Sequence, residues 1–587
     1  MKRLLLSALL IAFTGILFAK KVEIKDAKII AVNAYFEKVN HYYGIVNFQD
    51  LKITEQYVIN NNGEEVIYAF NFSNYGFILI AAEDAIEPIL GYTFDSQYNN
   101  GPKQEGFQGV LDGYSEHIIF LRSNGIEAST EIAAEWQQLI HYVPGQLTSV
   151  DGSKDVEPLL TCTWNQDWPY NYYCPEDEDG PGDHVYVGCV ATAMSQIMLH
   201  WRYPTQGNGS KSYYYPPYGT ISANFGATTY DWDGMVDNSD SKINLPMALI
   251  GFHAGVAVEM MYDWDGSGAY STDVPYAVRQ YFGYSSTCVY KSRSSYQLPA
   301  WKNMAKAELN DDCPIYYSGQ LPNNGGGHAF VLDGFHYNDD MYHFNFGWSG
   351  SANGWYLITD AGGFTNGQGM VINFFPQDDD YPYGCQPDVT YTNALGSFED
   401  GSGPMENYDQ YASCSWLIDP QTELDSIEYI SLEFITLDTE PDDIITIYDG
   451  ETTSDPVLGV YSGTSTPGDD IVATGNKMLV VFEADGDAVT ASGWKLEYTG
   501  HLASYCGSLE ILTAQTGILG DGSGQDWNYN NGSNCMWKIE PQFATGITFE
   551  FTQFHTEEDV DEVNVYDAGN NQLLATYSGE YTSGNMP

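Results

Sequence analysis

One cysteine at the start of a predicted helix could act as a nucleophile. Cys189 directly follows Gly188 and opens a run whose apolar residues recur at helical spacing. A cysteine in the first turn of a helix lies at the positive end of the helix dipole. That position stabilises a thiolate and lowers the pKa of the thiol. The sequence therefore predicts that Cys189 is a sulfur nucleophile.

Two downstream residues supply the other groups that such a nucleophile needs. His328 follows a glycine run at 325–327 and begins an apolar stretch typical of a strand, and glycine lets backbone or substrate approach closely. We expect His328 to take the thiol proton and later give it to the leaving amine. Asn345 would accept a hydrogen bond from the imidazole, and Trp348 would shield that bond from water.

Attack on a carbonyl also needs a donor for the negative charge that develops on its oxygen. Gln166 and the backbone N–H of Cys189 are the candidates. Taken singly, each of these residues has an ordinary structural explanation, such as a buried thiol, a satisfied histidine or a turn asparagine. Their combination with the glycine runs and the predicted helix favours catalysis.

Length and charge set the limits within which this chemistry operates. The chain has 587 residues, too many for a single core, so we expect three or four domains. It carries 79 acidic against 22 basic residues, a formal net charge of −57. Such a surface repels nucleic acid and anionic membranes, and we expect neither as a partner.

Residues 1–19 have the pattern of a secretory signal peptide. Lys2 and Arg3 precede an uncharged, largely apolar run that ends at Ala19. The run is shorter than the ~20 residues that a membrane span needs, and no later stretch is long and apolar enough. We expect an exported protein without a membrane span, either secreted or associated with the cell surface.

Four separated motifs in the region 155–378 resemble the streptopain-type peptidases, a secreted branch of the papain-like cysteine peptidases. A histidine and an asparagine about 130–150 residues after the cysteine are typical of papain-like enzymes. The motifs are Trp164-Asn-Gln-Asp-Trp-Pro-Tyr-Asn171, Gly188-Cys-Val-Ala-Thr-Ala193, Gly326-Gly-His-Ala-Phe-Val-Leu-Asp-Gly334 and His343-Phe-Asn-Phe-Gly-Trp-Ser-Gly350.

This resemblance implies a papain-like α+β catalytic domain with a role for each candidate residue. Cys189 would be the nucleophile and His328 the general acid and base. Gln166 would bind the oxyanion, Asn345 would orient the imidazole, and Trp348 would shield it. The substrates would be proteins or peptides, and no cofactor would be required. Phe346, where a family member has tryptophan, departs from the pattern but removes no group that carries a proton.

The region 20–150, here called the prodomain, resembles the inhibitory propeptide of that family around 77–92. Its periodicity predicts an α+β unit with helices and strands. The resemblance implies a zymogen that is inhibited by its own propeptide. Processing would fall between Gln146 and Pro158, and the exposed linker makes Lys154 a candidate. The helices are expected at 26–40, 111–124 and 132–142, and the strands at 66–72, 76–84 and 89–93.

The family also prefers an apolar residue two positions before the scissile bond. The aromatic-rich stretches 213–232 and 262–284 are candidates to line such a pocket.

Beyond about Asp378 the sequence repeats itself, with period-2 strands that predict all-β sandwiches. Cys385 and Cys414 have the same spacing as Cys506 and Cys535. The repeats resemble CUB domains and are expected at 383–501, here CUB1, and at 504–587, here CUB2. CUB2 looks truncated, as if the chain were a fragment of a longer one. The resemblance implies binding, to a ligand that the sequence does not identify.

Many CUB domains bind calcium through carboxylates, and oxygen-only ligands suit that ion. The resemblance maps this set onto Glu440, Asp443 and Asp485 in CUB1, and onto Glu557 and Asp561 in CUB2. In a chain this acidic, solvated acidic loops are an equally good explanation.

The nine cysteines fit an exported protein with disulfide bonds. The resemblance pairs Cys385 with Cys414 and Cys506 with Cys535, and Cys189 is the odd one. The other four leave room for two bridges in any of three pairings. They are Cys162, Cys174, Cys288 and Cys313.

The sequence thus predicts a secreted cysteine endopeptidase made as a zymogen, with CUB-like repeats for binding. Two alternatives remain open. One is a binding or adhesion protein whose peptidase domain is catalytically retired. The other is an acyltransferase that uses the same nucleophile.

Overall fold

The computed structural model describes most of the chain from residue 20 to residue 581. The gaps within it are 43–46, 74–75, 95, 102–104, 144–154, 240–242, 322–325, 338–339, 379, 423–425, 503–504, 508, 524–528, 530–531 and 558–559. The predicted signal peptide and most of the predicted processing region, with Gln146 and Lys154, lie outside the described residues. Among the described residues, no helix combines the length and the apolar composition that a membrane span requires.

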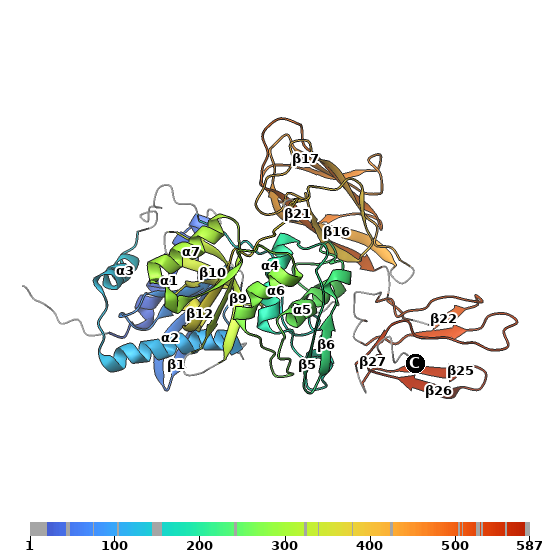
Figure 1. Cartoon of the computed structure of the whole chain (residues 1–587), viewed down its shortest axis with the longest axis horizontal. Coiled ribbons are helices and arrows are strands. Elements are labelled where there is room, and N and C mark those ends of the chain that lie inside the picture. Colours follow the sequence, from blue (N-terminus) through green and yellow to red (C-terminus); the bar gives the residue numbers. More distant parts are fainter. Residues whose placement is uncertain are drawn as a thin grey trace, which may run out of the picture.

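One ten-stranded sheet passes through both the prodomain and the catalytic region (Figure 1). Its order is β1-β2-β3-β4-β11-β10-β9-β8-β12-β7, so the first four strands in space come from the prodomain. The prodomain strands are β1 (Ile53–Asn61), β2 (Glu64–Phe72), β3 (Phe77–Ala81) and β4 (Ile89–Thr93). The catalytic strands are β7 (Val289–Ser292), β8 (Ile315–Gln320), β9 (Gly327–His336), β10 (Met341–Asn345), β11 (Gly354–Leu357) and β12 (Asn366–Ile372).

The two parts of the sheet join where β4 pairs with β11. The pairing is antiparallel and sets Trp355 opposite Tyr92 and Tyr356 opposite Gly91. A Cβ at Gly91 would lie 2.6 Å from the ring of Tyr356, so the close approach requires glycine there. Buried side chains on both sides of the junction form one continuous hydrophobic core.

Helices cover this sheet and form a second layer beside it. Helix α1 contacts β2 and β3, α2 contacts β1 and β2, and α7 contacts β8 and β9. The strands are predominantly apolar, and the helices cover apolar side chains that would otherwise face water. The bounds are α1 (Ile24–Tyr42), α2 (Glu105–Asn124), α3 (Thr130–Ile140) and α7 (Leu298–Asn310).

The prodomain elements predicted from periodicity are present, with one addition. The three predicted helices correspond to α1, α2 and α3, and the three predicted strands to β2, β3 and β4. Strand β1 was not predicted. Its residues are mostly polar and partly exposed, because it is the outermost strand of the sheet, so it lacks the apolar pattern of its neighbours.

The other half of the catalytic region is built around helix α4 (Cys189–Trp201), which is buried along nearly all of its length. Helix α4 contacts α5 and lies against β8 and β9 of the sheet. A separate core holds this half together. This half of the catalytic region also contains the hairpin of β5 and β6. The remaining bounds are α5 (Leu245–Ala257), α6 (Val274–Tyr281), β5 (Lys211–Tyr215) and β6 (Gly219–Ala223).

CUB1 is a sandwich of two sheets with its own buried core. Cys385 and Cys414 form a disulfide bond. One sheet has the order β13-β15-β20-β17-β18 and the other β14-β21-β16-β19. The bounds are β13 (Val389–Tyr391), β14 (Leu395–Glu399), β15 (Ser413–Ile418), β16 (Ile427–Asp438), β17 (Ile444–Tyr448), β18 (Val457–Tyr461), β19 (Ile471–Val472), β20 (Met478–Glu483) and β21 (Gly493–Leu502).

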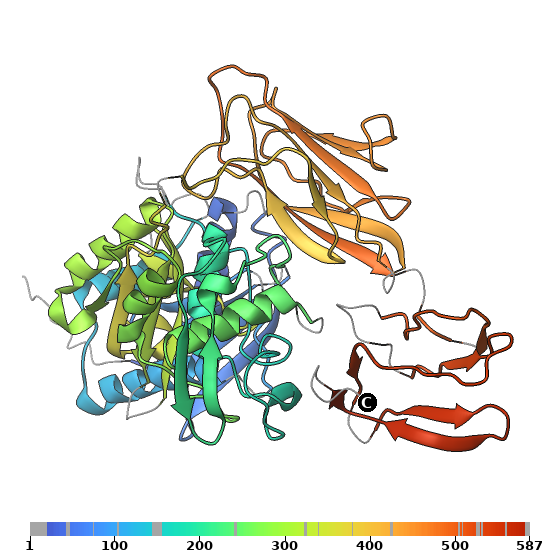
Figure 2. The same ribbon diagram turned by 45° about the vertical axis from the view of Figure 1, so that its right-hand side comes forward.

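The described residues of CUB2 form three strand pairs, and Cys506 and Cys535 form a disulfide bond. Figure 2 shows it in red as a body separate from CUB1 in orange. It reaches the catalytic region where Glu580 lies 3.5 Å from Nε2 of His184. The bounds are β22 (Leu509–Leu512), β23 (Met536–Ile539), β24 (Phe554–His555), β25 (Val563–Asp567), β26 (Gln572–Tyr577) and β27 (Glu580–Tyr581).

The four cysteines for which the sequence allowed two further bridges are all free thiols. Each is buried, and burial raises the pKa of each thiol above its ordinary value. Buried protonated thiols behave as small apolar side chains, so these residues serve packing. They are Cys162, Cys174, Cys288 and Cys313.

Candidate active site

Cys189 is the first residue of α4, as the sequence predicted. Gly188 precedes the helix with a φ of 90°, and a Cβ there would lie 2.7 Å from the sulfur of Met260. The turn that presents Cys189 therefore requires glycine for both backbone conformation and space. Cys189 itself is partly exposed, whereas Val190 and the residues after it are buried.

The thiol of Cys189 is not activated in this structure. Burial raises the pKa of the Cys189 thiol above its ordinary value, although the backbone N–H groups of Ala329 and Val190 act in the opposite direction. The predicted lowering by the helix terminus is therefore outweighed by desolvation. At neutral pH the sulfur carries its proton.

His328 lies near the start of β9, opposite Gly319 on β8. Its Nε2 is 2.8 Å from the carbonyl oxygen of Phe346, and its ring stacks on Trp348 with centroids 4.5 Å apart. Burial lowers the pKa of the His328 imidazole to about 4, and the Phe346 carbonyl opposes that shift. The imidazole is therefore neutral at pH 7.

Asn345 does not hold the imidazole in the way that the sequence predicted. Its amide group donates to the carbonyl oxygen of Cys162 at 2.8 Å, and its Oδ1 accepts from the N–H of Gly347 at 3.1 Å. Both polar atoms of the side chain thus bond to backbone groups, of Cys162 and of the turn after β10. Sequence reasoning missed the Phe346 carbonyl, because a backbone group leaves no side-chain signature.

Gln166 lies on the segment beside Cys189. Its carbonyl oxygen accepts from the N–H of Val187 at 2.9 Å, two residues before the cysteine. Its side-chain Nε2 lies 3.4 Å from the carbonyl oxygen of Gly347. The structure thus places the Gln166 segment between the start of α4 and the turn after β10.

The elements that carry Cys189 and His328 are adjacent, since helix α4 contacts strand β9. Within the part of the chain that the structure describes, no hydrogen bond joins the sulfur to the imidazole. Both groups are neutral and they point to different partners. This geometry holds the components of a nucleophilic pair without the ion pair that would activate them.

The prodomain reaches this site through helix α2. A Cβ at Gly363 would lie 2.5 Å from the Cα of Val110 on α2, and one at Gly113 would lie 3.1 Å from the Cα of Gly363. The turn at 361–363 thus packs against α2 backbone to backbone. The next residue, Phe364, has its ring 5.4 Å from that of His328. The prodomain helix and the imidazole are therefore separated by one turn of the chain.

A group of carboxylates in CUB1 has the composition of a cation site. Oxygens of Glu440, Asp442 and Asp485 all lie within 4.8 Å of one another. Asp443, predicted as a ligand in place of Asp442, is buried and accepts from the N–H of Asp485 at 2.7 Å and from the hydroxyl of Tyr408 at 2.5 Å. The oxygen-only donor set fits calcium.

The second repeat preserves part of this arrangement. The hydroxyl of Tyr529 donates to Asp561 at 2.6 Å and accepts from the N–H of Glu557 at 3.1 Å. In CUB1, Tyr408 makes the equivalent contacts with Asp443 and with the N–H of Glu440.

Three family models match this chain in succession. The Spi protease inhibitor model matches residues 19–118, and the Peptidase C10 family model matches residues 164–356. The CUB domain model matches twice, at residues 385–498 and 506–586.

Known proteins resemble the same part of the chain. Thiol protease/hemagglutinin PrtT of Porphyromonas gingivalis is 32% identical over 376 residues, a match that spans 60% of this chain and 42% of that protein. Streptopain of Streptococcus pyogenes is 27% identical over 385 residues, 60% of this chain and 91% of that protein. The solved structure of active interpain A cysteine protease from Prevotella intermedia is 37% identical, covers 38% of this chain and 95% of its own, and gives a TM-score of 0.35.

These matches confirm the predicted multidomain fold class: an α+β prodomain, a papain-like catalytic domain and all-β CUB domains. The Peptidase C10 match and the thiol protease relative also confirm the prediction of a cysteine-type peptidase domain. The chain thus contains a Peptidase C10 domain, of the streptopain family, at residues 164–356, which follows an inhibitor-like N-terminal region and precedes two CUB domain matches.

Proposed function

We propose that this chain is the precursor of a secreted cysteine endopeptidase whose nucleophile is Cys189. The observation that supports this most is the position of Cys189 at the start of α4, a helix that contacts β9, the strand on which His328 lies. A cysteine and a histidine held by two rigid, adjacent elements are the minimum that acyl transfer through a thioester needs.

In the proposed reaction the Cys189 thiolate forms a bond to the carbonyl carbon of a peptide. The C–N bond of the peptide then breaks, and His328 gives the leaving amine the proton that it took from the thiol. Water hydrolyses the resulting thioester and regenerates the thiol. Gln166 and the backbone N–H of Cys189 would bind the oxyanion in each step, and the Phe346 carbonyl and Trp348 would orient the imidazole.

The described form would be the latent state. A protonated thiol and a neutral imidazole that do not share a proton cannot begin the reaction. We propose that prodomain helix α2 maintains this state through the 361–363 turn and Phe364. Cleavage in the region 146–158 and loss of the prodomain would let His328 turn toward Cys189 and form the ion pair. The predicted signal peptide, residues 1–19, supports export of the precursor.

The proposed enzyme would prefer an apolar residue two positions before the scissile bond, as the family resemblance implies. Large aromatic side chains lie exposed in both candidate stretches, among them Tyr214, Trp264 and Tyr270. Peptide substrates that vary at this single position test the preference. Equal kcat/KM for apolar and charged residues would contradict it.

Alkylation of Cys189 at different pH values tests the latent state. Burial raises the pKa of the Cys189 thiol in the precursor, so its thiolate forms only above the ordinary value of about 8.5. We expect iodoacetamide to react slowly at pH 7 and faster as the pH rises past that value. After prodomain removal, an ion pair with His328 would shift the profile to lower pH.

Mass spectrometry of the Cys189 peptide gives both profiles in one experiment. The peptide that contains Cys313 is the internal control, because burial raises the pKa of that thiol to about 12 and it should react slowly in both forms. Identical Cys189 profiles before and after prodomain removal would count against a latent precursor.

We further propose that CUB1 binds calcium through Glu440, Asp442 and Asp485. Three carboxylates in close proximity repel one another, and a bound divalent cation would neutralise them. Extracellular modules bind calcium with dissociation constants of about 10⁻⁴–10⁻³ M. Calcium above that range should raise the unfolding temperature of CUB1. Calorimetric scans of the full chain with calcium and with chelator measure this shift.

Asp485→Asn should abolish the shift, because it removes one charge from the cluster. Asp470→Asn is the matched control, since Asp470 is an exposed carboxylate of CUB1 outside the cluster. An equal shift in both variants would mean that calcium binds elsewhere.

A further inference from the structure

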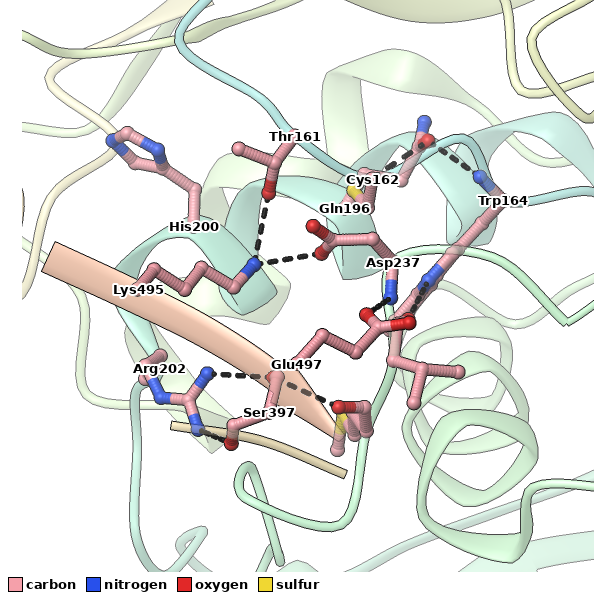
Figure 3. Close-up of polar contacts among 12 residues, drawn as sticks. Thr161, Cys162, Trp164, Gln196, His200, Arg202, Asp237, Ser397, Lys495 and Glu497 are labelled. Carbon is pink, nitrogen blue, oxygen red and sulfur yellow. Dashed lines mark hydrogen bonds and ion pairs between the residues drawn. The ribbon is translucent and has the colours of Figure 1, made fainter. Parts of the chain in front are cut away.

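CUB1 packs against the catalytic region through the outermost strand of one of its sheets, β14 (Figure 3). The N–H of Ser397 donates to the carbonyl oxygen of Asp233 at 2.9 Å, and its hydroxyl donates to the carbonyl oxygen of Met235 at 2.9 Å. A Cβ at Gly396 would lie 2.4 Å from the Asp233 oxygen, so strand and loop meet at backbone distance. The loop at 233–238 thus covers a strand that would otherwise present unpaired polar groups.

Arg202, which directly follows α4, contacts both the loop at 233–238 and strand β14. Its Nη2 lies 2.5 Å from Oδ1 of Asp233 and 2.7 Å from the carbonyl oxygen of Ser397. The guanidinium is nearly buried, with 9% of the side chain exposed. Buried arginines that satisfy several acceptors at once have little freedom to move, so the contact fixes β14 relative to α4.

Two side chains of β21, Lys495 and Glu497, extend the contact to Thr161 and Asp237 (Figure 3). Nζ of Lys495 lies 2.7 Å from Oδ1 of Asp237 and 2.8 Å from the hydroxyl of Thr161. The side chains of Lys495 and Asp237 are 13% and 12% exposed. Oε2 of Glu497 accepts from the N–H of Asp237 at 2.9 Å.

Asp237 depends on the lysine of CUB1 for its charge compensation. Its second carboxylate oxygen, Oδ2, is buried and has no hydrogen-bond partner in the described part of the chain. A carboxylate in this position is costly without a cation beside it. Lys495 is the cation paired with it.

The loop at 233–238, which contacts CUB1, also makes hydrogen bonds to the segment 161–166. The N–H of Thr163 donates to the carbonyl oxygen of Asp237 at 2.8 Å, and the indole N–H of Trp164 donates to that of Val236 at 2.9 Å. On its other side the same segment accepts the Asn345 amide at the carbonyl oxygen of Cys162, 2.8 Å away. The segment ends at Gln166, so it connects the CUB1 contact to the proposed oxyanion site.

We propose that CUB1 is a working part of the peptidase: by holding Asp237 through Lys495 and Glu497, it fixes the segment 161–166 and thereby places Gln166 for the oxyanion. Lys495 is a positioning residue in this scheme, because it touches no reacting group. This inference rests on the proposed function, in which Gln166 stabilises the transition state. It adds that the enzyme is completed by a domain outside the peptidase region.

Replacing Lys495 by methionine should slow turnover, although Lys495 touches none of the reacting groups. The change leaves the buried Asp237 carboxylate without its cation, so the loop and the segment 161–166 should shift. A displacement of about 1 Å at a catalytic group costs up to about 10²-fold in rate. We expect kcat to fall about 10- to 100-fold with little change in KM, because the oxyanion forms only in the transition state.

The experiment uses the full chain after maturation, with kcat divided by the amount of reactive Cys189 thiol. This normalisation removes any unfolded fraction from the comparison. Lys495→Arg keeps the charge and should restore most of the turnover. Lys477→Met is the matched control, because Lys477 pairs with Asp419 and Glu451, which both lie within CUB1.

Two further measurements keep the test decisive. Hydrogen exchange at the Thr163 amide measures how stably the segment 161–166 is bound to the loop at 233–238, independently of activity. The exchange should accelerate in Lys495→Met. The double variant Lys495→Met with Asp237→Asn removes both charges. It should recover part of the lost turnover, because Asp237 is no longer a buried carboxylate without its cation.

A fall in kcat per thiol with faster Thr163 exchange, both rescued by arginine, supports the inference. Unchanged kcat per thiol in Lys495→Met, or unchanged Thr163 exchange, overturns it while the proposed function stands. A matured wild-type chain that has a reactive Cys189 but cleaves no peptide would instead refute the proposed function. That failure is visible in the wild type alone.

Discussion

Full-length precursor that carries Cys189→Ala will keep its prodomain and show no peptidase activity above background. Removing a catalytic nucleophile costs about 10⁴-fold or more in kcat, because the remaining groups cannot form the acyl intermediate. Under reducing conditions, wild-type precursor should lose a fragment that ends in the region 146–158 and then cleave casein. Gel electrophoresis and N-terminal sequencing of both proteins measure the outcome.

The matched control is Cys313→Ala, which removes a buried thiol that takes no part in the proposed reaction. It should mature and cleave casein like the wild type. Maturation of Cys189→Ala in isolation would show that another nucleophile or a contaminating protease does the cutting. Loss of both activities in Cys313→Ala as well would indicate a folding defect and not a catalytic one.

Gly113→Leu in the prodomain should release the peptidase early. A Cβ at Gly113 would already lie 3.1 Å from the Cα of Gly363, and a leucine would push α2 away from the 361–363 turn. Overpacking of this kind costs about 1–3 kcal/mol, which corresponds to a shift of about 5- to 150-fold in the docking equilibrium. The lag before activation, followed by the hydrolysis of a fluorogenic peptide, should shorten accordingly.

His117→Leu is the control, because it adds the same side chain to an exposed position of α2. Leucine also favours a helix over glycine by about 1 kcal/mol, so a shorter lag in Gly113→Leu could not come from melting of α2. An unchanged lag would mean that the 361–363 turn does not transmit inhibition. The mature enzyme is identical in all three proteins, which confines the effect to the prodomain.

The start of α4 could be predicted because its signals are local. Gly188, the apolar spacing after Cys189 and Pro204 beyond the end together define the helix, and α4 runs from Cys189 to Trp201. The glycines before His328 likewise marked the start of β9. Such features depend on a few neighbouring residues, so one sequence is enough to find them.

The partners of the catalytic groups could not be predicted in the same way. The acceptor of His328 is the carbonyl oxygen of Phe346, a backbone group that every residue carries. Asn345 has the right side chain one position earlier, but its amide bonds to Cys162, which is far away in the sequence. Which side of a strand end a side chain occupies is decided by packing between distant segments.

The contacts between domains could not be predicted either, because they depend on long-range pairing. Strands β2, β3 and β4 of the prodomain were predicted one by one, yet nothing in them indicated that Gly91 and Tyr92 would pair with Tyr356 and Trp355. The same holds for the contact of Lys495 with Asp237. Each of these contacts joins residues that are hundreds of positions apart or belong to different domains, and their sequence neighbourhoods are unremarkable strands and loops.

The shared sheet has a consequence for the protein after activation. Departure of β4 would leave β11, the four residues Gly354–Leu357, as an outer strand whose N–H and C=O groups face solvent. Such a strand is a template on which another extended chain can add. The released prodomain already fits β11, so it would be the first chain to bind there. The newly activated enzyme would then be inhibited again by its own released prodomain. Destruction of the released fragment, and not cleavage of the linker alone, would then make activation irreversible.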